Sequence, residues 1–267
     1  MNNGVVLFAH NTENYDYFEM AVCCAKRVNH FLNLPVTLIS DHVTLHDKDT
    51  KLFDNVFTVE TNKSNQNRNK IWINKGRFRA YELSPYDKTI LLDVDYVINS
   101  TQLLKTLDFV VDICAHRNTQ YIDSYKSNQE FLSTYSHQTF WATVIVYKKT
   151  LKSKLVFDSL KMIENNYSHY GILHNFLYQQ YRNDYGLTLA LDLVNGHVFD
   201  ESDVIPWNLI HVQNANRFYK NNGDEFCNEY TTIFDKVYNG RTKTEYLTTS
   251  DMDFHMLDKN KLLELFQ

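Results

Sequence analysis

The sequence contains few of the residues that build phosphate-binding loops. Only seven of its 267 residues are glycine, and three are proline. Neither the G-x-G-x-x-G motif of dinucleotide-binding proteins nor the G-x-x-x-x-G-K-[ST] motif of P-loop proteins occurs. Both motifs need glycine, because a backbone without Cβ atoms can approach phosphate oxygens closely. The chain therefore lacks the usual phosphate cradle of both classes.

Cysteine is scarce and shows no motif spacing. The four cysteines are Cys23, Cys24, Cys114 and Cys227. None of them forms a C-x-x-C pair, so neither a zinc ribbon nor a dithiol redox motif is supported. Buried, reduced thiols are the interpretation that this spacing favours.

Long apolar runs are also missing. No stretch reaches the roughly 20 apolar residues that span a bilayer, and the first residues form a strand-like run without a basic region or a cleavage pattern. We therefore expect a cytoplasmic protein. The net charge of −5 argues against uniform affinity for nucleic acid, although it allows a local basic patch.

Apolar residues make up 43% of the chain, enough for one sizeable core. Strand-like runs alternate with helical periodicity through the first half, which is typical of βαβ units and a largely parallel sheet. We predict strands at residues 5–9, 36–39, 56–59, 88–92, 109–115, 140–147 and 209–213, and helices at 18–32, 71–83, 151–165 and 172–193. Residues 116–138 are predicted to be a polar loop, and the tail from 214 to contain mixed short elements.

Two carboxylates one residue apart, Asp93 and Asp95, end the apolar run at 88–92. Alternate side chains of a strand point the same way, so both carboxylates should leave one face while Val94 returns to the core. Hard oxygen ligands at the end of a strand suit Mg²⁺ or Mn²⁺, and hence a diphosphate. Two other Asp-x-Asp pairs follow no such run: Asp47 with Asp49, and Asp251 with Asp253.

Polar residues also end two other predicted strands, namely His10, Asn11 and Asp41. Ligands of open parallel sheets bind outside the carboxyl ends of the strands. Asp41 could accept a hydrogen bond from a base or a ribose hydroxyl, and His10 or Asn11 could line the same crevice. Capping of the following segment is the alternative for each of them.

The segment 62–79 carries six basic residues and no acidic one: Lys63, Arg68, Lys70, Lys75, Arg77 and Arg79. Lys75 and Arg79 are four apart on the predicted helix, so they would share a face and could neutralise a diphosphate. Lys70, Trp72 and Arg77 are candidates for binding a polyanionic acceptor, with the indole available for stacking. A solvated surface is the alternative.

The order of these elements resembles glycosyltransferases of the GT-A class, particularly glycogenin-like ones. The resemblance is carried by residues 86–95 (YDKTILLDVD), similar to the strand that delivers the metal-binding aspartates, and by residues 139–149 (TFWATVIVYKK), similar to an acceptor-side strand. In the latter, Trp141 and Thr143 replace the family's Asn and Gly, which makes Trp141 a candidate acceptor contact. The resemblance implies a GT-A-like nucleotide-diphospho-sugar transferase fold, with a mixed, mostly parallel central sheet flanked by helices.

The same resemblance implies roles for residues later in the chain. Residues 182–185 stand where the family has an acidic motif heading an inward-facing helix, so Asp184 should touch the donor sugar or the acceptor hydroxyl, with Asn183 beside the donor. His211 matches the late histidine that completes the metal shell, whereas the glycine- and lysine-containing segment that follows this histidine in the family is not evident. The implied organisation is one domain over 1–267, with a nucleotide-sugar half (1–115), an acceptor half (116–215) and a C-terminal extension (216–267).

The resulting hypothesis is a transferase that uses Mn²⁺ or Mg²⁺ to move a sugar from a nucleotide-sugar donor, a UDP-sugar, to an acceptor hydroxyl. The Asn-, Lys- and Tyr-rich chain also resembles small GT-A proteins of large tailed phages, including ones that glycosylate 5-hydroxymethylcytosine in DNA. That resemblance implies DNA as acceptor and the host cytoplasm as location. Alternatives are a surface polysaccharide or lipid-linked glycan acceptor, a nucleotidyltransferase, and a non-catalytic nucleic-acid-binding module.

Overall fold

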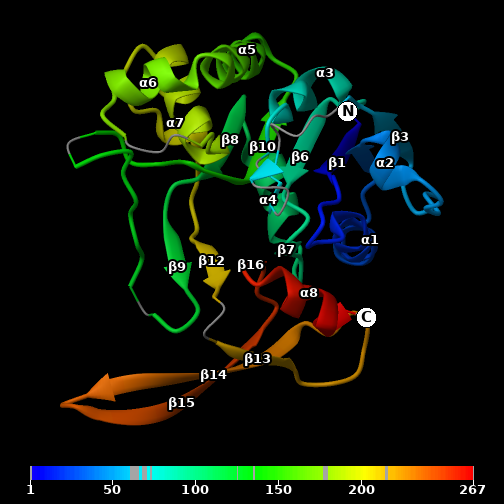
Figure 1. Cartoon of the computed structure of the whole chain (residues 1–267), viewed down its shortest axis with the longest axis vertical. Helices are drawn as coiled ribbons and strands as arrows, with labels where there is room; N and C mark the ends of the chain where they lie inside the picture. Colours follow the sequence, from blue (N-terminus) through cyan, green and yellow to red (C-terminus); the bar gives the residue numbers. More distant parts are fainter. Residues whose placement is uncertain are drawn as a thin grey trace.

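A seven-stranded mixed sheet forms the centre of the molecule (Figure 1). The computed structural model describes residues 2–60, 66–67, 71–72, 74–124, 126–134, 136–176, 180–213 and 216–266. The strand order is β11-β8-β10-β6-β1-β2-β3, and every neighbouring pair is parallel except the two pairs made by β10. The strands are β1 (Asn3–Phe8), β2 (Val36–Ser40), β3 (Asn55–Thr58), β6 (Lys88–Leu92), β8 (Ile113–His116), β10 (Trp141–Lys148) and β11 (Val204–Ile205).

Helices cover both faces of this sheet, because its buried strands are apolar on both sides. Along β1, Val5 and Leu7 belong to one core, while Val6 and Phe8 belong to the other. The first core includes α1 (Tyr17–Arg27) and α4 (Gln102–Phe109); the second includes α3 (Ala80–Leu83), α5 (Leu151–Asn165), α6 (Tyr167–Leu173) and α7 (Asn183–Val194). The predicted α/β fold with a mixed, mostly parallel sheet flanked by helices is confirmed. In the described part of the chain, no helix is both long and apolar enough to cross a membrane.

A second sheet contains residues from widely separated parts of the chain. Its order is β7 (Tyr96–Val97), β16 (Phe254–Met256), β12 (Leu209–Val212) and β9 (Thr119–Tyr121). β7 begins directly after Asp95, and the register places His211 of β12 beside His255 of β16. The last helix, α8 (Lys259–Phe266), follows β16. The end of the chain therefore returns to the carboxyl end of β6.

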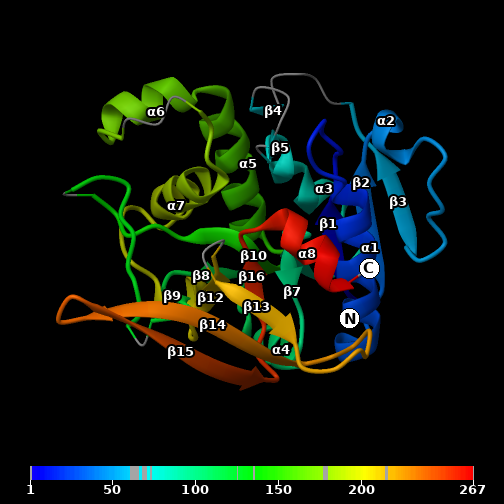
Figure 2. The ribbon, with the colours of Figure 1, turned by 60° about the horizontal axis from the view of Figure 1, so that its bottom comes forward.

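A long hairpin projects from the opposite side to α5, α6 and α7 (Figures 1 and 2). It consists of β14 (Glu229–Tyr238) and β15 (Arg241–Ser250), joined at Asn239 and Gly240, which both have positive φ as a type I′ turn requires. β13 (Arg217–Lys220) pairs with β14. The prediction of mixed short elements from residue 214 onward holds for β13, β16 and α8, but not for the hairpin, whose two strands are each 10 residues long. Strand β15 is mostly exposed and shows little apolar alternation, so its local signal is weak.

Several predicted elements differ from the observed ones in type, in length or in continuity. The predicted helix 71–83 is instead a short strand β5 (Ile71–Trp72) paired with β4 (Gln66–Asn67), a 3₁₀ turn (Arg77–Arg79) and α3. Asn74 and Gly76 both have positive φ, which a helix does not allow. The predicted strand 109–115 includes the last residue of α4 and most of β8. The predicted polar loop 116–138 contains β9, and the predicted helix 172–193 is interrupted between α6 and α7. The remaining described elements are α2 (His42–Leu45), a π-helical turn (Val28–Leu32) and a 3₁₀ turn (Glu201–Asp203).

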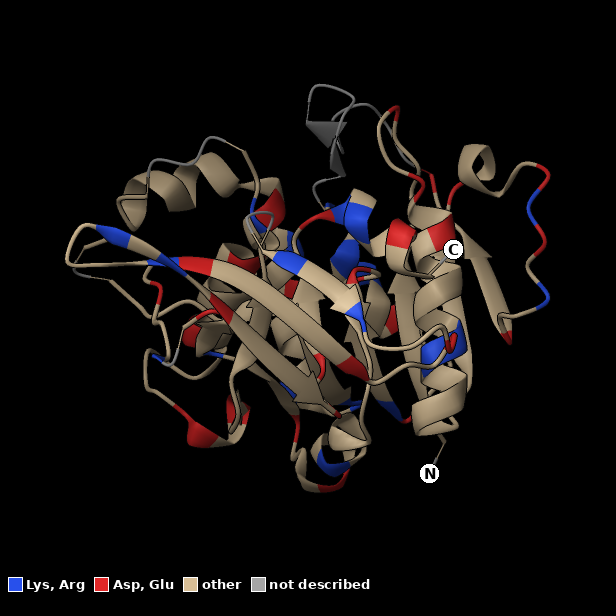
Figure 3. Ribbon diagram, turned by 90° about the horizontal axis from the view of Figure 1, so that it is seen from below, with Lys and Arg blue, Asp and Glu red and all other residues tan. Residues whose placement is uncertain are grey.

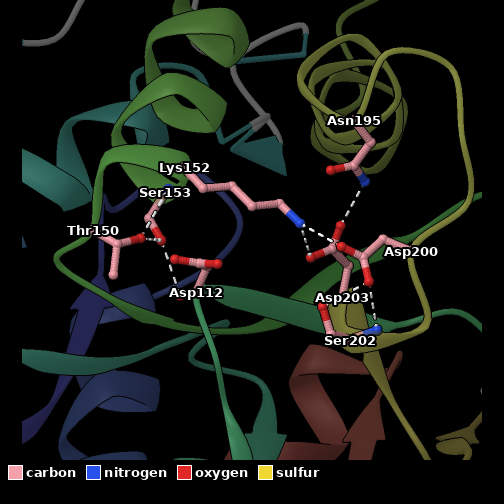
Figure 4. Close-up of polar contacts among 8 residues, drawn as sticks. All are labelled: Asp112, Thr150, Lys152, Ser153, Asn195, Asp200, Ser202 and Asp203. Atoms are coloured by element: carbon pink, nitrogen blue, oxygen red, sulfur yellow. Dashed lines mark hydrogen bonds and ion pairs between the residues drawn. The ribbon is translucent and has the colours of Figure 1, made fainter.

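A partly buried ion-pair network joins the start of α5 to the segment after α7 (Figure 4). Lys152 binds Asp200 and Asp203, each at 2.8 Å, and the Asn195 amide donates to Asp203 at 2.6 Å. Burial raises the pKa of the Asp203 carboxyl, and Lys152 opposes this effect. Thr150 caps α5 by accepting from the Ser153 N–H. These contacts hold α7 in place behind β10.

Candidate active site

The two predicted carboxylates come together at the carboxyl end of β6. Asp93 directly follows that strand, and a turn closed by the Tyr96 N–H on the Asp93 carbonyl brings Asp95 next to it. Val94 is buried, as the alternation predicts. Asp93, Asp95 and His255 offer ligand atoms that all lie within 4.8 Å of one another. Two carboxylates and an imidazole form a donor set that suits Mn²⁺ or Mg²⁺.

Each carboxylate also lies against a cation. Arg77 Nη1 is 2.6 Å from Asp93 Oδ1, and Lys259 Nζ is 2.6 Å from Asp95 Oδ2. His255 Nε2 lies 3.3 Å from Asp95 Oδ1. The two acids and two cations cancel in formal charge. A divalent ion entering together with a diphosphate would nearly preserve this balance, so the electrostatics favour their joint binding over binding of a bare metal ion.

The two carboxyl groups titrate differently. Burial raises the pKa of Asp93, and the charge of Arg77 only partly opposes it. Burial would also raise the pKa of Asp95, but Lys259 and His255 together hold it well below its ordinary value. Asp95 therefore remains a carboxylate at neutral pH, as a metal ligand must.

Two cavities meet at these residues. One, of about 160 Å³, is lined by Phe8, Tyr17 and Lys259 among others. The second, of about 170 Å³, is lined by residues of β10 and the start of α7. Both share Asn74, Asp93 and His255 as a common wall. The carboxylates therefore stand in the middle of one cleft, with an aromatic side and a polar side.

Asp184 reaches the polar cavity from the first turn of α7. Its carboxylate accepts hydrogen bonds from the Ala142 N–H at 2.9 Å and from Arg182 at 3.3 Å. The Thr188 hydroxyl accepts from the Phe140 N–H and donates to the Asp184 carbonyl, which ties α7 to the start of β10. A helix N-terminus also favours an anionic side chain. These contacts fix the carboxylate in position.

Three side chains that line the polar cavity carry buried donors without an acceptor among the described residues. These are Nδ2 of Asn183, Nε1 of Trp141, and Nε and Nη2 of Arg77. An unsatisfied buried donor costs about 1–3 kcal/mol. Donors gathered around one cavity therefore point to a ligand that is rich in oxygen atoms.

The predicted nucleotide-binding residues His10, Asn11 and Asp41 organise local structure instead of lining either cavity. Asp41 caps α2 by accepting the Thr44 N–H at 2.7 Å, and its other oxygen lies 3.1 Å from His10 Nδ1. The side-chain oxygen Oδ1 of Asn11 accepts a hydrogen bond from the Phe18 N–H at the start of α1. These contacts are the capping alternative that the sequence left open, and a role in nucleotide binding stays a prediction.

His211 lies one strand away from the carboxylates. Its Nδ1 is 3.2 Å from Nδ1 of His255, and its ring packs 4.8 Å from Trp141. Burial, together with the neighbouring His255, lowers the pKa of His211 to about 3. The group within reach of the carboxylates contains His255 instead, and the role of His211 as a ligand stays a prediction.

Sequence reasoning missed His255 and Lys259. His255 lies within the short β-type run that begins at Phe254, and Lys259 stands four residues after the histidine. This pattern is too short to distinguish from chance, and it lies in the tail that was expected to contain mixed elements.

Of the basic side chains of segment 62–79 that the structure describes, only Arg77 contributes to the site. Arg77 was a candidate acceptor contact, but its side chain is buried against Asp93. Lys75 and Arg79 line neither cavity. Lys70 and the side chain of Trp72 lie outside the described residues.

No protein-family model and no curated protein match the sequence. Among solved structures, the chain is similar to galactosyltransferase LgtC in complex with donor and acceptor sugar analogues, at 14% identity over 70% of both chains and a TM-score of 0.44. It is also similar to mouse xyloside xylosyltransferase 1, at 11% identity over 80% of this chain and 89% of that one, with a TM-score of 0.46. A third similar structure is the glycosyltransferase GlyE of Streptococcus pneumoniae, at 12% identity and a TM-score of 0.40. The match covers 73% of this chain and 43% of GlyE, so this chain spans less than half of GlyE. We base the function on the geometry of the site.

Proposed function

We propose that this protein is a metal-dependent glycosyltransferase that moves a sugar from a nucleotide-sugar donor, a UDP-sugar, to an acceptor hydroxyl. The observation that carries the proposal is the group of Asp93, Asp95 and His255 at the junction of two cavities. These residues would hold Mn²⁺ or Mg²⁺. The bound ion would supply Lewis-acid stabilisation of the negative charge that develops on the leaving diphosphate.

The two sides of the cleft suit the two halves of the donor. Phe8 and Tyr17 offer aromatic surface for a nucleoside in one cavity. Arg77 and Lys259 flank the carboxylates and can neutralise a diphosphate at the junction. The unsatisfied donors of Asn183 and Trp141 suit sugar hydroxyls in the polar cavity. This polarity also favours a sugar donor over the nucleoside triphosphate of a nucleotidyltransferase.

Asp184 faces the cavity assigned to the sugar. If the reaction inverts the anomeric configuration, Asp184 is the general base that takes the proton of the acceptor hydroxyl. If the reaction retains it, Asp184 orients the donor sugar. In both cases the N–H of Ala142 and the guanidinium of Arg182 hold the carboxylate in place.

For the acceptor we propose the hydroxyl of 5-hydroxymethylcytosine in DNA, on the strength of the sequence resemblance to phage enzymes. A surface polysaccharide or a lipid-linked glycan is the alternative, and it is favoured by the mixed charges. In Figure 3, Lys and Arg are interspersed with Asp and Glu along the ribbon, whereas a dedicated DNA-binding face would be mainly basic.

The donor chemistry is tested by hydrolysis of a panel of UDP-sugars with Mn²⁺ or with EDTA. We expect Mn²⁺-dependent hydrolysis that falls about a hundredfold or more in Asp95→Asn. Asp47→Asn is a matched control, because Asp47 belongs to another Asp-x-Asp pair and its side chain is 88% exposed. Circular dichroism confirms that both variants fold. Full activity in EDTA, or in Asp95→Asn, would contradict the proposal, and pyrophosphate release from a nucleoside triphosphate would favour a nucleotidyltransferase.

The acceptor is tested separately with a radiolabelled donor. We expect label to enter DNA that contains 5-hydroxymethylcytosine and not unmodified DNA of the same sequence. Transfer to polysaccharide or lipid-linked glycan, with none to modified DNA, would establish the alternative.

A further inference from the structure

A third cavity, of about 160 Å³, lies farther along α7 than Asp184. Its walls are Arg117, the part of α7 from Thr188 to Asp192, the segment before β10, and residues 195 and 197–200. It shares no lining residue with the two cavities of the active site. The proposed glycosyl transfer therefore leaves it without a role.

The side chain of Arg117 is the distinctive feature of this cavity. Its Cζ atom lies 4.1 Å from the ring centre of Phe199 and 5.6 Å from that of Phe140. Its Nε atom is buried, and within the described ranges no residue accepts a hydrogen bond from this guanidinium or forms an ion pair with it. Burial lowers the pKa of Arg117, with no acidic side chain acting against this effect. The cavity thus contains a partly desolvated cation that forms no ion pair with any described carboxylate.

The acidic side chains of the cavity are already paired. Asp192 lies 2.5 Å from His197 Nδ1 and 3.3 Å from His137 Nδ1, one histidine on each carboxylate oxygen. Asp200 is bound by Lys152. Neither acid forms an ion pair with Arg117. Because both histidines use Nδ1 toward Asp192, their Nε2 atoms can interact with a further group.

We infer that this cavity binds an oxyanion, the phosphate or carboxylate group of a small molecule, through Arg117. Contact with aromatic rings occupies the faces of a guanidinium and leaves its N–H edge available, and this edge matches a phosphate or carboxylate with two parallel hydrogen bonds. The anion would be the ion-pair partner that this guanidinium lacks, and it would satisfy the buried Nε donor. The inference does not depend on glycosyl transfer.

The test uses the ¹⁵N–¹H signals of arginine Nε–H groups, because a buried Nε–H exchanges slowly with water. Arg117→Lys assigns the signal of Arg117. Inorganic phosphate and, separately, acetate are titrated into the full-length protein without metal or nucleotide. We expect a saturable shift of the Arg117 signal with at least one of the two anions, and the more effective anion identifies the group that the site prefers.

Arg117→Met should weaken this binding about tenfold or more, as measured by calorimetry. Arg241→Met is the matched control, because Arg241 is exposed at the start of β15, and it should bind as the unchanged protein does. Arg117→Lys keeps a cation without the guanidinium fork, so its affinity for the anion should lie between those of Arg117→Met and Arg241→Met. This variant also tests the inference if Arg117→Met does not fold. The inference is overturned if neither anion moves the Arg117 signal, or if only the Arg77 signal of the active site responds.

Discussion

His211 and His255 lie side by side on neighbouring strands, but they meet different groups. His255 Nε2 is 3.3 Å from Asp95, whereas Nδ1 of His211 faces His255 and its Nε2 has no partner among the described residues. The imidazole of His255 is therefore within reach of the carboxylates, and the imidazole of His211 contacts that of His255. Sequence resemblance alone could not separate these two roles, because both histidines occupy short β-type runs.

We predict that His255→Gln lowers Mn²⁺-dependent hydrolysis of the donor, with a rise of about tenfold or more in the Mn²⁺ concentration for half-maximal activity. His211→Gln should change this concentration less and should mainly lower the temperature of unfolding, because it places an amide in a buried site. Mn²⁺ titrations and thermal unfolding of both variants provide the check. The opposite pattern would restore His211 as the metal ligand.

At the scale of elements, the position of Asp184 depends on how α7 is held. The first two turns of α7 are bound to β10 through the Ala142 N–H and to the residue before β10 through the Phe140 N–H. The segment after its last turn is bound to the start of α5 through Lys152 and the buried Asp203 (Figure 4). Helix α7 is thus fixed at both ends, and loss of the second attachment leaves a buried carboxylate without its cation.

We predict that Lys152→Met lowers the free energy of unfolding by about 2–3 kcal/mol, somewhat below the range for a fully buried pair because Lys152 is partly exposed. Lys152→Met combined with Asp203→Asn should recover part of this loss, since no buried charge is then left unpaired. Lys154→Met removes an exposed i,i+4 pair with Asp158 and should change stability far less than Lys152→Met does. Urea unfolding of the variants measures these differences; an equal loss for Lys152→Met and Lys154→Met would rule out the proposed attachment.

At the scale of the whole molecule, Arg27 connects the N-terminal half to the last part of the chain. Its guanidinium donates to the carbonyls of Ile98, Cys227 and Glu225 and to the side chain of Asn99. The rings of Phe218, Tyr230 and Phe254 pack together close to these contacts, at the base of the long hairpin. Arg27 therefore helps to hold the segment that carries His255 and Lys259 against the main domain.

We predict that Arg27→Met costs about 3 kcal/mol of stability, because several buried carbonyls lose a charged donor at once. Limited proteolysis of this variant should release the region after residue 216 sooner than in the unchanged protein. Lys26→Met is the control, since Lys26 makes an exposed pair with Glu225 and its loss should cost less than about 1 kcal/mol. Uniform cleavage across the chain would argue against a specific role of Arg27.

The parts of the fold that were predictable from sequence have strong local signals. Strand β6 and its two carboxylates were found because an apolar, β-branched run ends abruptly in Asp93. The periodicity of 151–165 matches α5 residue for residue. The prediction failed at 71–83, where Asn74 and Gly76 adopt positive φ and exclude a continuous helix. It also failed for the long hairpin, because β15 is exposed on much of its surface and shows little apolar alternation.

By itself the sequence determined the run of β-strands and the paired acids at the end of one of them, because these depend on residues that are adjacent in the chain. Only the tertiary structure decided which cations and which imidazole meet those acids. Lys259 reaches Asp95 across 164 residues of sequence, and Arg77 turns inward from a segment that was expected to be a surface helix. Contacts of this kind depend on the path of the chain in three dimensions, which local patterns of polarity do not determine.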